Sequence, residues 1–291
     1  MKKVLSVLLA ASLVLGMTAC GSTASSEAAS EPAASESTAS SEAASSEAAS
    51  DATSDTASAE VTTVEPGKLI MSTNAAFPPY EMTADGGSFE GIDVEIAGAI
   101  AEKLDLELQI DDMDFDAALL AAQTGKSDMV MAGVTVTEDR QTVMDFSDSY
   151  AAGIQVVIVP EDSDIASIDD MTGKMIGVQR GTTGDQYCSA SVEDGGFGEE
   201  NVTRYDNGLT AVQALNNGQV DCVVIDNAPA QEFVAANPGL KILDTEYANE
   251  EYAIGVAKGN TQLLDAINTA IAELKADGTI QSILDKYISA E

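Results

Sequence analysis

Two charged residues occupy positions from which a folded chain could present them to a ligand. Asp226 directly follows the apolar stretch 220–225, which is typical of a buried strand, so its carboxylate would project from the carboxyl edge of a sheet. Arg140 follows a stretch of valine, threonine and acidic residues. Both residues also have an ordinary structural interpretation, because Asp226 could cap the next helix and Arg140 could pair with a nearby acid. Considered separately, neither residue defines a site.

Two motifs for phosphate and calcium are incomplete. Residues 124–127 read Thr-Gly-Lys-Ser, like the end of a P-loop, but Leu120 stands where the first glycine is required. An alternation of aspartates beginning at Asp112 resembles the start of an EF-hand loop, whose glycine and final glutamate are both missing here. Asp114 is better explained as the N-cap of a following helix.

The composition excludes several classes of enzyme and partner. The chain has no histidine, which excludes Ser-His-Asp hydrolases, Cys-His proteases and His-ligated zinc sites, and three cysteines cannot form a Cys₄ site. We therefore predict no metal and no cofactor. The 49 acidic residues outnumber the 13 basic ones, and a net charge of −36 would repel nucleic acid.

The N-terminal residues predict export and anchoring. A basic start and an apolar run ending near Leu15 are typical of a signal peptide over 1–19, since the run is too short to span a bilayer. Residues 17–21 resemble the bacterial lipobox, in which Cys20 is lipidated. The Ser/Ala/Glu-rich segment 20–62 cannot bury a core and is predicted to be a disordered tether. The protein is thus expected to be extracytoplasmic and anchored to the bacterial cell membrane.

Short apolar runs alternate with helix-period segments along the rest of the chain. Strands are predicted at 69–71, 106–110, 129–134, 154–159, 175–178, 202–205, 220–225, 240–243 and 252–257. Helices are predicted at 92–104, 117–122, after Gly184, and at 210–215, 229–235, 263–274 and 280–287. This alternation predicts an α/β fold with mostly parallel sheets.

The alternation forms two series, which predict two lobes. We expect the first lobe to comprise 63–151 plus 250–291 and the second 152–249. The chain would cross between them twice, near 150–155 and near 245–252, and two crossovers make a hinge. In open α/β sheets ligands lie beyond the carboxyl ends of the strands, so a site is expected between the lobes.

An ordered set of motifs resembles the family 3 extracellular solute-binding proteins, the amino-acid receptors of ABC importers. The opening loop reads Phe-Pro-Pro-Tyr-Glu at 77–81, and the start of the first helix reads Phe-Glu-Gly-Ile-Asp-Val-Glu at 89–95. Further segments in family order are 114–115, 132–140, 145–150, 177–184 and 223–226. The resemblance covers 66–288 and implies the two-lobed, type II periplasmic-binding-protein-like fold.

The resemblance also implies how each end of an amino acid is held. Arg140 would grip the α-carboxylate, because a guanidinium group matches a carboxylate with two parallel hydrogen bonds. Thr183, at a helix start, would add a backbone N–H to the same group. Asp226 would bind the α-ammonium group, together with the Gly133 carbonyl and the Thr135 hydroxyl.

Four residues would surround the ligand side chain. Phe77 and Phe115 would lie on either side of it, although both could instead be ordinary core residues. Asn74 stands where the family often has aspartate, which weakens the case for a basic ligand. Gln179 lies where side-chain specificity is also determined. Of the remaining arginines, Arg180 is expected to point away from the ligand and Arg204 to lie on the surface.

The resemblance implies a monomeric receptor that binds a small-molecule amino acid and delivers it to the permease subunits of an ABC importer, and not an enzyme. Two alternatives remain open. The same fold supports an exported dehydratase acting on a cyclohexadienyl acid, for which Glu81 is the available general acid. The second alternative is a stand-alone sensor domain for a partner kinase, although the lipobox favours a receptor for an importer. An exported protein could form a disulfide between Cys188 and Cys222, but two buried thiols are favoured.

Overall fold

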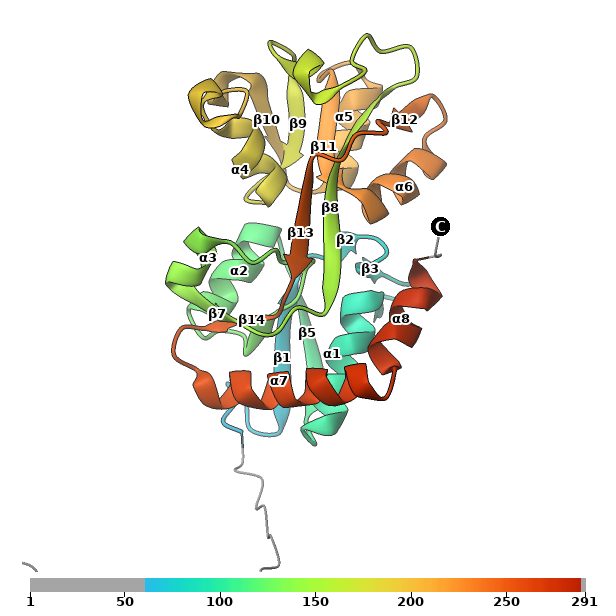
Figure 1. Ribbon diagram of the computed structural model, residues 1–291. Helices are drawn as coiled ribbons and strands as arrows, with labels where there is room; N and C mark the ends of the chain where they lie inside the picture. The colour runs from blue at the N-terminus through green and yellow to red at the C-terminus, as the bar shows by residue number, and fades with distance from the viewer. Residues whose placement is uncertain (1–60, 289–291) are drawn as a thin grey trace, which may run out of the picture. The chain divides into compact units, whose positions relative to one another are not determined.

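The computed structural model describes residues 61–288. Its two lobes each contain a β-sheet with helices on both faces (Figure 1). The predicted signal peptide 1–19, Cys20 and almost all of the predicted tether 20–62 lie outside the described residues. Within 61–288, no helix has the length and apolar character needed to cross a bilayer.

The sheet of the first lobe has five strands. In spatial order they are β5 (Glu107–Asp112), β1 (Lys68–Thr73), β6 (Met129–Val130), β14 (Gly255–Ala257) and β7 (Met144–Phe146). Strand β14 comes from the C-terminal part of the chain and pairs with both β6 and β7. A small separate sheet joins β2 (Ala76–Phe77), β3 (Glu81–Thr83) and β4 (Phe89–Glu90).

The sheet of the second lobe follows the order β10 (Val202–Tyr205), β9 (Ile176–Gln179), β11 (Cys222–Asp226), β8 (Ala151–Pro160) and β12 (Leu240–Ile242). Strand β13 (Ala248–Tyr252) pairs with the first half of β8. Figure 1 shows β8 and β13 running side by side between the two lobes. The sequence predicts one strand over 252–257, whereas the structure has two, β13 and β14, one in each sheet.

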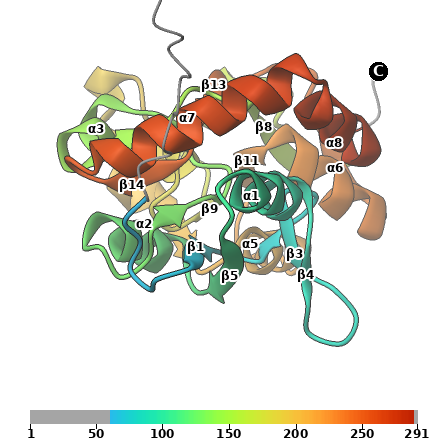
Figure 2. The same ribbon diagram turned by 90° about the horizontal axis from the view of Figure 1, so that it is seen from below.

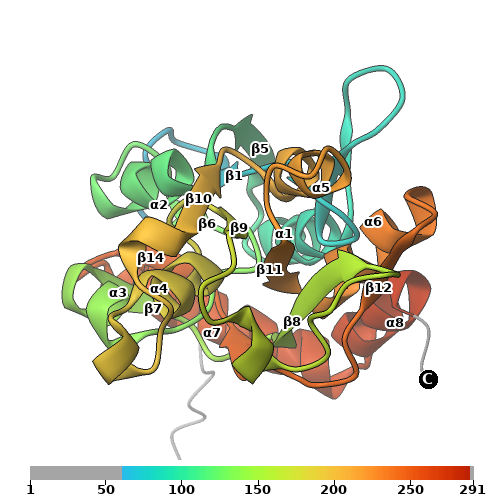
Figure 3. The same cartoon turned by 90° about the horizontal axis from the view of Figure 1, so that it is seen from above.

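Helices cover both faces of each sheet. In the first lobe they are α1 (Ile92–Lys103), α2 (Phe115–Gln123), α3 (Glu138–Val143), α7 (Thr261–Ala276) and α8 (Thr279–Tyr287). In the second lobe they are α4 (Thr183–Ser189), α5 (Gly208–Asn216) and α6 (Asn227–Ala236), with 3₁₀ turns η1 (Ile168–Met171), η2 (Val192–Asp194) and η3 (Glu199–Asn201). Figure 2 shows α7 lying across the lower face with α1 and α8 beside it, and Figure 3 shows α4 to α6 around the upper sheet.

The core follows from alternation along the strands. Met129 packs in the same buried cluster as the isoleucines of α1, whereas its neighbour Val130 packs with α2 on the other face. In β11, Val223 packs with α5 and α6, whereas Val224 packs with Cys188 of α4. Strands β6 and β11 thus bury both faces, which explains their continuous apolar runs in the sequence.

The α/β, two-lobed expectation is confirmed, but the sheets are mixed. Strand β1 pairs in parallel with β5 and β6, and β9 with β10 and β11, as strand–helix–strand units require. Strands β8 and β14 pair antiparallel with all their neighbours, because each follows a passage of the chain between lobes and enters its sheet from the opposite end. The prediction of mostly parallel sheets therefore holds only for the strand–helix–strand part of each lobe.

The start of α1 is tied to the loop before β3. The backbone N–H groups of Ile92 and Asp93 donate to the carbonyl oxygens of Pro79 and Tyr80, at 3.0 and 2.9 Å. These contacts satisfy two donors that a helix N-terminus would otherwise leave free. They require close backbone approach at Gly91, which has φ 130° and where an added Cβ would lie 2.2 Å from the Tyr80 carbonyl oxygen.

We expect Gly91→Ala to lower the free energy of unfolding by about 1–3 kcal/mol, because it adds both backbone strain and a clash with the Tyr80 carbonyl. Gly98→Ala is the matched control, since Gly98 lies within α1 and an added Cβ there meets no atom within 4 Å. That change should instead raise stability by about 0.5–1 kcal/mol. Urea denaturation followed by circular dichroism measures both, and equal effects would contradict this explanation of Gly91.

Cys188 and Cys222 are both free and buried, as expected from the sequence. They lie in the same apolar cluster of the second lobe, with Val178 and Phe197. Burial raises the pKa of the Cys188 thiol to about 12, which keeps that sulfur protonated at neutral pH. Both residues therefore pack as small apolar side chains.

Candidate ligand-binding site

A pocket lies between the two lobes, and residues of both lobes line it. A lining that combines aromatic side chains with a few polar and charged groups is typical of a small-molecule site. The structure brings all nine residues of the predicted site together in its lining: Asn74, Phe77, Phe115, Gly133, Thr135, Arg140, Gln179, Thr183 and Asp226. Three further residues complete the lining: Glu81, Ala132 and Thr182.

The carboxyl ends of the strands position most of these residues. Asn74 follows β1 of the first lobe, while Gln179 and Asp226 are the last residues of β9 and β11 in the second. In each lobe the parallel strands end at one edge of the sheet, and the residues at these two edges line the same pocket. Phe115 begins α2 after Asp114, which occupies the predicted N-cap position but makes no side-chain capping hydrogen bond.

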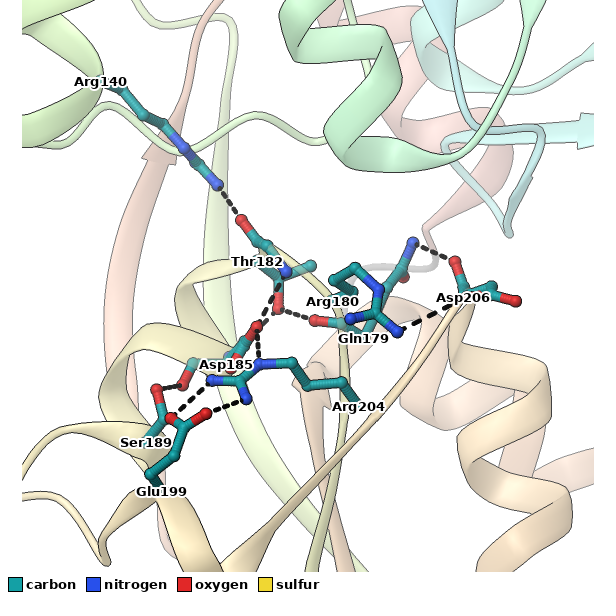
Figure 4. A network of polar contacts seen from close by, with 10 residues as sticks. Arg140, Gln179, Arg180, Thr182, Asp185, Ser189, Glu199, Arg204 and Asp206 are labelled. Atoms are coloured by element: carbon teal, nitrogen blue, oxygen red, sulfur yellow. Dashed lines mark hydrogen bonds and ion pairs between the residues drawn. The ribbon is translucent and has the colours of Figure 1, made fainter. Parts of the chain in front are cut away.

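Arg140 is buried and contacts both lobes. Its Nη1 donates to the Thr135 carbonyl at 2.7 Å, and its Nη2 donates to the Gly181 carbonyl of the second lobe at 3.1 Å (Figure 4). The guanidinium group lies over the Phe115 ring, 5.5 Å from its centroid. Burial lowers the pKa of Arg140, whereas the acids Glu250 and Asp226 act to raise it. Since a guanidinium has five N–H donors, three remain available for an anionic group.

A second polar contact also joins the lobes. Gln179 Nε2 donates to Asn74 Oδ1 at 2.9 Å, and both side chains are buried. Asn74 Nδ2 in turn donates to the Met113 carbonyl at 2.9 Å. The side-chain end of the pocket therefore contains two amides that hold each other in place. Neither of them carries a charge that could neutralise an ionised ligand side chain.

Asp226 is fully buried and is held by Tyr252. The Tyr252 hydroxyl donates to the Asp226 carboxylate. Burial raises the pKa of Asp226 to about 7, although the hydrogen bond from Tyr252 acts in the opposite direction. A cationic group beside Asp226 would restore the ionised form, because an opposite charge favours it. Asp226 is therefore suited to receive an ammonium group.

Glu250 is a buried acid beside the pocket that the sequence interpretation missed. It lies in β13 and accepts hydrogen bonds from the Thr135 hydroxyl at 2.9 Å and from Gln155 Nε2 at 3.1 Å. Because Thr135 donates to Glu250, the lone pairs of its hydroxyl oxygen face other partners. Burial alternates along β13: Glu250 and Tyr252 are buried, while Glu251 between them is exposed. Placing 248–252 in a strand with Tyr252 facing inward would have identified Glu250 as a buried acid.

A pair of buried acids lies at the first-lobe side of the pocket. Glu81, the first residue of β3, and Asp93 of α1 are both fully buried and adjacent. Asp93 accepts the backbone N–H of Gly133 at 3.0 Å, which fixes the loop after β6. The Tyr150 hydroxyl also lies beside Asp93. The sequence motifs place Glu81 in the opening loop, where it was considered as the general acid of a dehydratase and not as a ligand-binding residue.

The other two arginines lie outside the pocket. Arg180 is half exposed, with Nη2 3.9 Å from Asp206, as expected for a side chain that points away from the site (Figure 4). Arg204, expected on the surface, is 25% exposed and bridges Asp185 and Glu199, with Nε 2.8 Å from both Asp185 oxygens. This bridge forms because Asp185 is itself buried and requires a cation.

Arg204 thereby stabilises the start of α4. Asp185 Oδ2 accepts the backbone N–H of Gly181 at 2.9 Å, and the Thr182 hydroxyl accepts the backbone N–H of Asp185 at 3.2 Å. These bonds fix the turn that presents Thr183 to the pocket and the Gly181 carbonyl to Arg140. Among residues 61–288, no group of three or more acidic, cysteine or histidine side chains is arranged to hold a metal ion.

Comparison with known proteins identifies related chains. The family described as bacterial extracellular solute-binding proteins, family 3, matches residues 69–290. A probable histidine-binding protein of Neisseria gonorrhoeae is 34% identical over 232 residues, which cover 78% of this chain and 85% of that protein.

Solved structures of related proteins are similar to this chain in both sequence and fold. An ancestral arginine-binding protein bound to glutamine superposes with a TM-score of 0.72 at 40% identity, covering 78% of this chain and 100% of that one. A structure of an ancestral arginine-binding protein bound to arginine gives a TM-score of 0.71 at 41% identity, with coverage of 77% and 99%. The two-lobed fold is therefore one that binds amino acids in related proteins.

Proposed function

The chain belongs to the family 3 bacterial extracellular solute-binding proteins, and from this membership we propose that it is the amino-acid receptor of an ABC importer. The family resemblance read from the sequence motifs is thereby confirmed. Related proteins are named for binding histidine and arginine. The ligand proposed for this chain is an α-amino acid, held between the lobes and released to the permease subunits.

The observation that carries this proposal is that Arg140 and Asp226 line the same pocket. A guanidinium group with free donors and a buried carboxyl group match the two charged groups of a zwitterion. The Gly133 carbonyl, the Thr135 hydroxyl and the backbone of Thr183 would complete the hydrogen bonds. Phe77 and Phe115 would enclose the side chain. A site with both charges in place favours amino acids over plain carboxylic acids or amines.

The two passages of the chain between sheets support a hinge. We propose that residues 63–151 plus 250–291 move as one lobe and 152–249 as the other, with bending where β8 and β13 run between them. Support comes from β14, which lies in the sheet of β1, and from α8, which packs on α1. Ligand binding would draw the lobes together, because its two charged groups contact opposite sides of the pocket.

A thermal-shift screen of the twenty amino acids, with cystine and ornithine, tests the proposal. A true ligand at a hundred times its Kd should add about 2.7 kcal/mol to the stability of the folded protein, whereas non-ligands should leave the melting temperature unchanged. The screen also identifies the ligand for calorimetry. No stabilisation by any of these compounds would contradict the assignment.

Anchoring through a lipid on Cys20 remains part of the proposal, and so does a monomeric state. Mass spectrometry of the membrane fraction would detect the lipidated cysteine after cleavage. The alternative, a dehydratase that uses Glu81 as its general acid, is favoured by the position of that acid in the pocket. The relatives are named as binding proteins, and we therefore propose binding without turnover. Formation of an aromatic product from a cyclohexadienyl acid would instead support the dehydratase.

A further inference from the structure

Glu250 is a buried acid that lies directly behind a residue of the pocket. It belongs to β13, one of the two strands that run between the lobes, and it does not itself line the pocket. Its Oε2 accepts from two side chains, the Thr135 hydroxyl at 2.9 Å and Gln155 Nε2 at 3.1 Å. Thr135 does line the pocket. Glu250 is therefore placed to act on a ligand through Thr135.

The chemistry of this pair fixes which atom is the donor. A carboxylate carries no proton and can only accept, so the Thr135 hydroxyl uses its single proton toward Glu250. The two lone pairs of the hydroxyl oxygen are then left for a donor in the pocket. A hydroxyl group without such a partner rotates freely and can either donate or accept. The bond to Glu250 therefore holds the Thr135 hydroxyl as an acceptor.

The backbone of Thr135 is held by bonds that do not involve the Glu250 side chain. Thr135 forms an isolated antiparallel bridge with Tyr252. The next N–H group along β13 and its continuation, that of Ala253, donates to the Val134 carbonyl at 3.0 Å. A change of the side chain at position 250 should therefore alter the orientation of the Thr135 hydroxyl and leave its backbone in place.

The charge of Glu250 offers a second explanation of its role. Burial is the main cause of the raised pKa of Asp226, and the negative charge of Glu250 adds to it. The positive charge of Arg140 and the hydroxyl group of Tyr187 in α4 also act on Glu250 from the two lobes. Glu250 could thus favour an ammonium group simply by its charge. The two explanations differ in what a neutral acceptor at position 250 would do.

On the basis of the proposed function, we propose that Glu250 is a positioning residue, which makes the pocket selective for an α-ammonium group by holding the Thr135 hydroxyl as a hydrogen-bond acceptor. The ammonium group then finds the lone pairs of Thr135 in addition to the carboxylate of Asp226. A ligand that has no donor at this point leaves both acceptors without a partner, which is unfavourable in a closed pocket. Selectivity for amino acids over the corresponding carboxylic acids thus depends on a residue behind the pocket lining.

Ligand pairs that differ only in the α-ammonium group test this inference. The pairs are glutamine with glutaramic acid, and arginine with δ-guanidinovaleric acid, since related proteins have been solved with glutamine and with arginine bound. If the thermal-shift screen identifies another amino acid, its own des-amino analogue forms the pair. The quantity compared is the preference, defined as the ratio of the two dissociation constants within a pair. Calorimetry measures the amino acid, and competition measures the weaker analogue.

Two variants at position 250 separate orientation from charge. Glu250→Met keeps the length of the side chain but removes the acceptor, so we expect the preference to fall by about 10- to 100-fold, as for a lost bond to a charged group. Glu250→Gln removes the charge but retains an oxygen that can accept from Thr135, and its amide N–H groups lie close to the Tyr187 hydroxyl. This conservative variant should keep the preference of the wild type.

Glu251→Met is the matched control, because Glu251 is the exposed neighbour on the same strand. It should leave the preference unchanged. Thr135→Val keeps the shape of the threonine side chain but removes its hydroxyl. In that background Glu250→Met should have no further effect on the preference, because a positioning residue acts only through the group that it orients.

Nuclear magnetic resonance of the unmodified protein tests the same inference if Glu250→Met does not fold. A buried hydroxyl proton that is bonded to a carboxylate exchanges slowly with water. The proton of the Thr135 hydroxyl should therefore show nuclear Overhauser contacts with the Glu250 side chain, both in the empty protein and with the amino acid bound. Absence of these contacts, or their loss when the amino acid binds, would overturn the inference.

Three results with the variants would also overturn it. An equal loss of preference in Glu250→Met and Glu250→Gln would assign the effect to charge. Equal weakening of both members of a pair would leave Glu250 a purely structural role, and a full effect of Glu250→Met in the Thr135→Val background would exclude Thr135 as the intermediary. In each case amino-acid binding by the wild type, and hence the proposed function, still stands. Absence of binding by every amino acid instead overturns the proposed function and this inference with it.

Discussion

Replacing Arg140 by alanine is expected to abolish amino-acid binding while leaving the protein folded. The side chain is buried, and two backbone carbonyls hold it in place, which leaves its other donors pointing to the pocket. Loss of a buried charge-assisted partner costs about 2–5 kcal/mol of binding free energy, roughly one and a half to nearly four decades in Kd. Isothermal titration calorimetry with the ligand from the screen measures the loss.

Arg180→Ala is the matched control for this experiment. Arg180 lies in the turn after β9, close to the pocket in sequence, but its side chain is half exposed and faces Asp206. The control should change affinity little. Arg140→Lys adds a second comparison, because an ammonium group retains the charge but does not match a carboxylate with two parallel bonds. Equal losses for Arg140→Ala and Arg180→Ala would show that the carboxylate is bound elsewhere.

Replacing Asp226 by asparagine is expected to have a comparable effect on affinity and the opposite effect on stability. Asparagine keeps the shape and can still accept from Tyr252, but it offers no charge to an ammonium group. Loss of that buried charge pair should cost about 2–5 kcal/mol of binding free energy. A des-amino analogue of the ligand should bind the variant and the wild type with similar, weak affinity.

The stability effect follows from the sign of the pKa shift. The pKa of Asp226 is raised to about 7 in the folded protein, so folding favours its protonated form. Its contribution to stability is complete below the pKa of the unfolded chain, about 4, and is lost as pH rises to about 7. At pH 8 the empty variant should therefore melt at a higher temperature than the empty wild type. A lower melting temperature would contradict the assigned protonation state.

Closure of the lobes provides a further measurement on the same residue. In the wild type, the amino acid should shrink the radius of gyration measured by small-angle scattering, whereas the des-amino analogue should not. Burying Asp226 without an ammonium partner is unfavourable, so closure depends on the charge of the ligand and not only on its size. Equal compaction by both compounds would show that Asp226 is not the ammonium partner.

The sequence by itself determined the type of most elements and the residues at the strand ends, although it did not predict α3 or the short strands β2, β3, β4 and β7. Apolar runs bounded by turn residues predicted the strands, and the spacing of isoleucines predicted the buried face of α1. These signals are local, because side-chain direction within one strand or helix follows from backbone geometry alone. The family motifs, also local, named the nine residues that the structure brings into one pocket.

Only the tertiary structure decided which distant side chains meet. Gln179 bonds to Asn74, and Thr135 to Glu250, across separations of 105 and 115 residues. Arg204, expected on the surface, pairs with a buried acid because α4 packs against β10. Glu81 and Asp93 become neighbours because the N–H groups that start α1 bond to carbonyls just before β3. Burial and shared charge, which set the protonation of these acids, are properties of the packed chain and have no signature in local sequence.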